Sequence, residues 1–175
     1  MDANEMLKTN AYDLMHGWKS KAMLSRQAHY DSANYYSRLH LWFGIPVIAL
    51  TTLVGTGAFA SLQESPNITL RLLAGILGVI SAILASLQTF FNYQGLGEKH
   101  RNSANKYSAL VREMEMHIQM PVAYADMAKL VDEWRIKYDS VQEESPSVPQ
   151  RIWLSTIQKP DVSVDASKTG QPSSE

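Results

Sequence analysis

Two long apolar runs that contain no charged side chain dominate the hydrophobic pattern of this chain. Residues 39–63 and residues 72–97 hold no Asp, Glu, Lys or Arg. Their apolar cores, at about 41–62 and 72–92, are as helices long enough to cross the roughly 30 Å of hydrocarbon in a bilayer. Buried helices of soluble proteins usually keep a polar face, so the pattern favours two transmembrane helices over a buried helical pair.

The topology of these two spans follows from the short connection between them, residues 63–71, which requires an antiparallel hairpin. Basic residues flank the spans on the side of the two termini, and the connection holds only Arg71. They are Lys21, Arg26 and Arg38 before the first span, and Lys99, Arg101, Lys106 and Arg112 after the second. Because Lys and Arg collect on the cytoplasmic side of a membrane, both termini are predicted to be cytoplasmic.

The parts outside the hairpin show helical amphipathic periodicity rather than further apolar runs. An amphipathic helix is predicted within 1–40, and two more within 93–141, the first continuing from the second span with weak points at Gly95 and Gly97. Residues 142–159 are expected to form an extended, proline-containing strap, and 160–175 a disordered tail. The expected fold is an all-α membrane protein with a two-span transmembrane hairpin and a cytoplasmic helical bundle.

Composition and motifs argue against several classes of function. The chain has 16 basic and 17 acidic residues and no cysteine, so it offers no bulk charge for nucleic-acid binding, no disulfide and no thiolate chemistry. It contains no phosphate-binding loop and no catalytic or metal-ligand signature, so neither an enzyme nor a cofactor is expected. His100 beside Glu98 is the one pair worth weighing, and a surface position or an inter-helix hydrogen bond is favoured there over a metal or acid–base role.

The second span carries two sets of residues that suggest specific roles. Small residues recur every fourth position, which favours close helix packing: Ala74, Gly78, Ala82 and Ser86. An adjoining, more polar face supplies the pore-lining candidates: Ser81, Ala85, Gln88 and Asn92. One hairpin cannot enclose a pore, so conduction requires a homo-oligomer; the alternative is that both faces only hold hairpins together.

The order of these segments resembles the SLATT domain family over roughly residues 12–155. The resemblance rests on the stretch "FFNYQGLGEKHRNSANKYSALVREMEM" after the second span and on the later "ESPSVPQRIW". It implies a bacterial inner-membrane effector of antiphage conflict systems, which oligomerises, breaches the membrane and causes abortive infection. It also implies a partner encoded nearby: a nucleotidyltransferase, a SLOG-type sensor or a reverse transcriptase.

The sequence therefore predicts an oligomeric, pore-forming membrane effector that conducts when a partner sensor or nucleotide signal triggers it. The competing hypothesis is a membrane anchor or scaffold that holds a partner enzyme and conducts nothing. Candidates for a partner or oligomer interface are Trp134, Tyr138 and Trp153.

Overall fold

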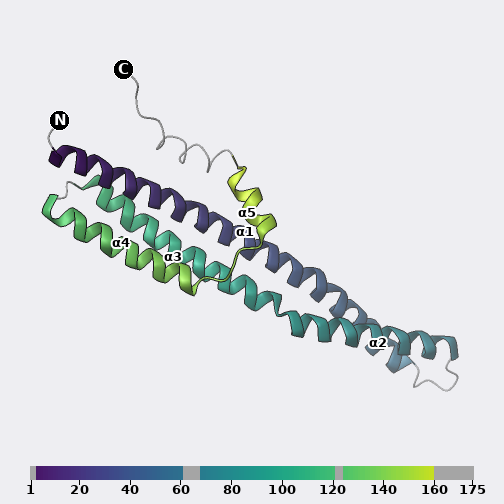
Figure 1. The fold of residues 1–175 in the computed structure, drawn as a ribbon. Helices are drawn as coiled ribbons and strands as arrows, with labels where there is room; N and C mark the ends of the chain where they lie inside the picture. The colour runs from purple at the N-terminus through teal and green to yellow at the C-terminus, as the bar shows by residue number, and fades with distance from the viewer. Residues whose placement is uncertain (1–2, 61–67, 121–123, 160–175) are drawn as a thin grey trace. The chain divides into compact units, whose positions relative to one another are not determined.

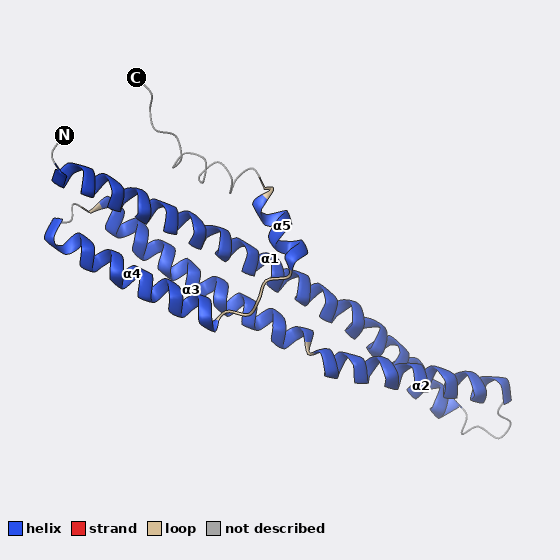
Figure 2. Ribbon diagram, viewed as in Figure 1, coloured by secondary structure: helices blue, strands red, loops and turns tan. Residues whose placement is uncertain are grey.

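The computed structural model describes residues 3–60, 68–120 and 124–159, and these ranges contain helices and loops but no strand (Figure 2). The helices are α1 (Ala3–Ala60), α2 (Ile68–Phe91), α3 (Tyr93–Gln119), α4 (Tyr124–Glu144) and α5 (Gln150–Ile157). The all-α prediction is confirmed. The chain divides into two compact units: a bundle unit, residues 1–33 with 98–175, and a hairpin unit, residues 34–97.

The bundle unit packs the first part of α1 against α3 and α4, which lie side by side with it (Figure 1). Each helix contributes the apolar stripe that its periodicity predicts, because residues three and four apart share a helix face. The buried cluster consists of Met15, Ala22, Tyr107, Leu110, Val111, Met114 and Trp134. Half-buried apolar side chains such as Trp18, Leu130 and Tyr138 pack around it. The bundle thus has one continuous apolar core.

The predicted extended strap is wrong over its second half, where residues Gln150–Ile157 form α5. The two prolines bias only the residues that precede them, and Pro149 stands at the N-cap of α5 with φ of −56°. A proline at this point suits a helix start, because the first N–H groups of a helix have no intrahelical acceptor. The extended segment is therefore limited to the few residues between α4 and α5.

Helix α1 continues without a break into the first predicted span and through Pro46 within it. Proline lacks the N–H that the carbonyl four residues earlier would accept, so the carbonyl of Trp42 loses its helical donor. The hydroxyls farther along the span bond within their own helix: Thr51 to the carbonyls of Val47 and Ile48, and Thr56 to that of Thr52. These threonine hydroxyls therefore donate their hydrogen bonds within their own helix, as polar groups surrounded by lipid require.

The second span is predicted to continue into the next helix with weak points at Gly95 and Gly97, but the helix is interrupted a few residues earlier, at Asn92. Asn92 has a φ of +42°, the only positive φ of a non-glycine residue in the described ranges. Its side-chain Oδ1 accepts the N–H of Gly95 at 3.2 Å, which makes Asn92 the N-cap of α3. A Cβ on Gly95 would lie 2.6 Å from Asn92 Nδ2, so glycine leaves the room that this cap needs.

Replacing Asn92 with alanine is expected to destabilise the full chain by about 2 kcal/mol, since it loses both the cap and the asparagine tolerance of left-handed backbone. Asn92→Gly keeps the backbone freedom, and glycine is itself an acceptable cap, so it should cost only a few tenths of a kcal/mol. Thermal unfolding in detergent micelles, followed by circular dichroism, measures both variants. Equal losses for the two variants would contradict a role for the positive φ.

Candidate functional site

The hairpin unit turns its large apolar side chains outward, unlike the core of a soluble protein. Trp42 is 79% exposed and Phe90 82%, and most Leu, Ile and Val residues of both spans are exposed as well. Helical stretches within Thr9–Gly57 and Arg71–Gln119 each include a segment long and apolar enough to cross a membrane. Exposed apolar surface on this scale is expected where lipid is the solvent.

Three glycines lie at close contacts between α1 and α2. A Cβ on Gly57 would lie 3.8 Å from Ala74 Cβ, one on Gly78 3.8 Å from Val54 Cγ1, and one on Gly44 3.2 Å from Gln88 Nε2. In these pairs the residue number on α2 decreases as the residue number on α1 increases, which confirms the antiparallel hairpin within this unit. The missing side chains allow the two backbones to approach closely, as in other membrane helix pairs.

Three of the four pore-lining candidates belong to this inner face of α2, and we call Ser81, Ala85 and Gln88 the polar seam. Ser81 is buried, and Ala85 and Gln88 are half-buried. The Ser81 hydroxyl has no hydrogen-bond partner among the described residues, and the Gln88 amide reaches the backbone surface at Gly44. The seam is thus enclosed within the hairpin in this structure, and a conducting role for it stays a prediction.

Asn92, the fourth pore-lining candidate, lies at the helix junction rather than in the seam. Its exposed side chain caps α3 through the N–H of Gly95. From the sequence, Asn92 is a polar residue at the end of an apolar span. The sequence does not show that its side-chain oxygen accepts a backbone N–H of the next helix.

The predicted packing stripe of small residues divides between two faces of α2. Ala74 and Gly78 contact α1, whereas Ala82 and Ser86 are exposed. A step of four residues overshoots a helical turn by about 40°, so three steps rotate the stripe by about 120°. The exposed half belongs to a shallow groove of about 540 Å³, which we call the outer groove. It is lined by Val79, Ala82, Ile83, Ser86, Leu87 and Phe90.

The three interface candidates outside the hairpin have different environments. Trp134 is fully buried in the bundle core, so its prediction as a partner contact is wrong. The periodicity of α4 had already placed it on the apolar stripe, and that stripe faces α1 and α3. Tyr138 is half-buried and packs edge-on against Tyr107, with ring centroids 6.0 Å apart. Trp153 is 37% exposed on α5, so it is accessible to a partner.

A buried histidine pair joins α1 to α3 inside the bundle unit. His29 Nδ1 and His100 Nδ1 are 2.9 Å apart, and the ring of Tyr107 stacks on His29. Burial, reinforced by the neighbouring His100, lowers the pKa of His29 from 6.5 to about 4, and burial also lowers the pKa of His100. The inter-helix hydrogen bond favoured for His100 is present. Its partner was not predicted, because 71 residues separate the two.

The described residues contain no group of three or more His, Asp or Glu side chains placed to hold a metal ion. The histidine pair connects two helices through its two Nδ1 atoms. The candidate features are the seam and the outer groove of the hairpin unit and, separately, the exposed face of α5 in the bundle unit.

Comparison with known proteins agrees with the membrane hairpin. The family model for fungal SLATT proteins, described as the SMODS and SLOG-associating 2TM effector domain, matches residues 21–144, more than half of the chain. No curated protein and no solved structure matches the chain. Two helices able to cross a membrane, in a family named for two transmembrane segments, indicate a membrane protein. The chain belongs to the SLATT family of two-transmembrane effector domains, associated by name with SMODS and SLOG proteins.

Proposed function

We propose that this protein is an effector that assembles into homo-oligomers and breaches a cellular membrane when a partner sensor or nucleotide signal triggers it. Its family supports the effector role, and the basic residues flanking the spans support cytoplasmic termini. The fungal name of the matched family widens the choice of membrane beyond the bacterial inner membrane that the resemblance predicted. In either setting the outcome is loss of the ion gradient and arrest of the cell, an antiviral response by abortive infection.

The observation that carries this proposal is the polar seam inside an otherwise apolar hairpin. A hydroxyl buried without a partner costs free energy, and lipid offers no water to relieve that cost. The Ser81 hydroxyl is in this position, one turn from Ala85 and two from Gln88. We therefore interpret the described hairpin as the closed state. In the open state α2 turns its seam from α1 toward water, and Ser81, Ala85 and Gln88 line the path.

The outer groove is the surface through which we propose that copies assemble. Ala82 and Ser86 leave a hollow between Val79, Ile83 and Phe90, which suits a helix of a second copy. The Ser86 hydroxyl bonds to the carbonyl of Ala82 at 2.8 Å, so the floor of the groove presents no unsatisfied polar group to that helix. Close backbone approach at small residues supplies the packing that lipid does not drive.

Replacing Ser81 with alanine is expected to favour the closed state by about 1 kcal/mol, since it removes an unsatisfied buried hydroxyl. That shift corresponds to about fivefold less of the open state. Membrane depolarisation and propidium uptake, measured in cells producing the full chain at matched levels with its trigger, should fall accordingly. Thr89→Val is the matched control, because its hydroxyl is exposed, already bonded to the carbonyl of Ala85 within α2 and outside the outer groove.

Two further variants separate the proposal from its alternative. Gln88→Leu removes the largest polar group of the seam and should abolish depolarisation while membrane insertion persists. Because the chain has no cysteine, Ser86→Cys supplies a single thiol that should form a disulfide-linked dimer in membranes, whereas Leu53→Cys, exposed on α1, should not. A triggered wild type that leaves the membrane potential intact would reject the pore and favour the non-conducting scaffold.

A further inference from the structure

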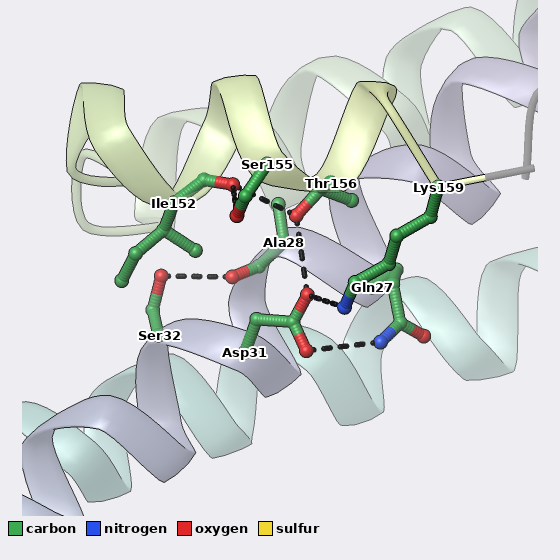
Figure 3. Close-up of polar contacts among 8 residues, drawn as sticks. All are labelled: Gln27, Ala28, Asp31, Ser32, Ile152, Ser155, Thr156 and Lys159. Carbon is green, nitrogen blue, oxygen red and sulfur yellow. Dashed lines mark hydrogen bonds and ion pairs between the residues drawn. The ribbon is translucent and has the colours of Figure 1, made fainter.

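The Asp31 carboxylate of α1 accepts hydrogen bonds from three side chains (Figure 3). Thr156 of α5 and Lys159 just after it are two of them, so this carboxylate links α5 to α1. Asp31 Oδ2 accepts the Thr156 hydroxyl at 3.2 Å and the Lys159 ammonium at 2.7 Å, and Asp31 Oδ1 accepts the Gln27 amide at 3.1 Å. Thr156 is fully buried at this contact. The side of α5 that carries Thr156 is therefore held against α1 within the bundle unit.

One side of α5 beside Thr156 is apolar and exposed. Trp153, Leu154 and Ile157 retain 37, 45 and 40% of their surface, and they lie within one helical turn of one another. None of the three belongs to the apolar core of the bundle unit, which α1, α3 and α4 form. Helix α5 thus buries Thr156, with Ile152 half-buried beside it, and leaves a tryptophan, a leucine and an isoleucine exposed, as expected of a helix that meets a second surface.

The charges around α5 identify the chemistry of that surface. Arg151 is exposed on α5, whereas Lys159 is paired with Asp31, and residues 145–160 contain no Asp or Glu. Basic residues beside an exposed Trp–Leu–Ile face are typical of helices that lie in a membrane interface, where the apolar side enters the acyl boundary and the basic side chains meet phosphate. A membrane is also the one such surface that this chain already meets, through its two spans.

We propose that α5 is an interfacial helix that lies on the cytoplasmic leaflet and binds anionic phospholipid headgroups, with Asp31 holding its inner face. Trp153, Leu154 and Ile157 enter the headgroup region, and Arg151 contacts lipid phosphate. The contact fixes the bundle unit to the membrane surface independently of the spans. This inference rests on residence of the chain in a membrane and not on pore formation.

The absence of cysteine allows the test to be made on the full chain by single spin labels. Leu154→Cys reports on the face of α5, and Ile76→Cys on an exposed apolar position of the second span. Ile136→Cys is the matched control, an exposed isoleucine of the same bundle unit on α4. Each labelled protein is reconstituted in vesicles of phosphatidylcholine mixed with phosphatidylserine. Collision with dioxygen, which partitions into lipid, is compared with collision with a water-soluble nickel chelate.

The expected result is an oxygen-to-nickel ratio at position 154 that is several times the ratio at position 136 and close to that at position 76. Arg151→Gln should weaken the lipid contact of α5 about fivefold, as should vesicles of phosphatidylcholine alone, if each basic residue contributes its usual attraction to an anionic surface.

Two other results would overturn the inference in different ways. If position 76 is lipid-exposed while position 154 is either water-exposed or shielded from both reagents, membrane residence stands but α5 does not bind lipid. Shielding from both reagents would assign its face to a protein, either a second copy or a partner. If position 76 is itself water-exposed, the chain does not reside in the membrane, and the proposed function fails with the inference.

Discussion

Replacing Trp134 with alanine is expected to lower the free energy of unfolding of the bundle unit by about 3–5 kcal/mol, the usual cost of truncating a buried tryptophan. The indole is fully buried among apolar side chains of three helices, and its ring lies 5.7 Å from that of His117. Truncation would leave a large cavity that neighbouring helices cannot fill without moving, because protein cores are close-packed. A loss of this size approaches the total stability of many domains.

Thermal and urea unfolding of the full chain in detergent micelles, followed by circular dichroism, measures this loss. Ile136→Ala is the control, since the side chain lies on the same helix and is 55% exposed; it should change stability by no more than about 0.5 kcal/mol. If Trp134 acted only as a partner contact, Trp134→Ala would unfold like the wild type and lose association alone. That outcome would contradict its place in the core.

The core of the bundle unit could be predicted because its three helices follow the same rule of periodicity. Met15, Tyr107, Met114 and Trp134 all lie on the stripes that a period of 3.6 selects, and all are buried. A local pattern suffices here, since an amphipathic helix in water has one face to bury. The error over Trp134 came from treating a large aromatic residue as an anchor for a partner when its own stripe already placed it inside.

The hairpin could be predicted as a pair of spans. Which residues of each span face the other helix, and which face outward, could not be predicted. In lipid, apolar side chains carry no information about which side of a helix is inside, because lipid tails are as apolar as leucine. Small residues were then the remaining indication of the contact face. Because they repeat every four residues, their position rotates around α2 from Ala74 to Ser86. Gly57 and Val54 of α1 contact Ala74 and Gly78, so α1 covers the first half of the repeat.

Two further features could not be predicted from the sequence, because one depends on residues far apart in the chain and the other on a single backbone angle. Asp31 binds Thr156 and Lys159 across more than 120 residues, and nothing in either segment alone indicates the other. The break at Asn92 depends on a positive φ, which asparagine permits but does not require.

Acid is expected to destabilise the bundle unit through the histidine pair. With both imidazoles neutral, one Nδ1 donates to the other across 2.9 Å; a second proton would direct two N–H groups at each other in a buried site. The neighbouring rings of Tyr107 and Tyr138 supply no negative charge to compensate. Because the folded pKa of His29 is lowered to about 4, the unfolded chain binds more protons between pH 6.5 and that value. Stability is complete above pH 6.5 and falls by about 3 kcal/mol as the pH drops through 4.

The test compares the full chain with His29→Gln from pH 7 to pH 4, by urea unfolding in detergent micelles. Carboxylates also titrate over this range, but they do so in both proteins, so the difference between the two unfolding free energies isolates the histidine. The wild type should lose about 3 kcal/mol relative to the variant between neutral pH and pH 4.

Tyr30→Phe removes a neighbouring hydrogen bond to Asn105 without removing an imidazole, so its curve should run parallel to that of the wild type. If His29→Gln fails to fold, His100→Gln removes the other half of the pair. Parallel curves for both histidine variants would contradict the lowered pKa, since a histidine that titrates alike in folded and unfolded chains adds no slope.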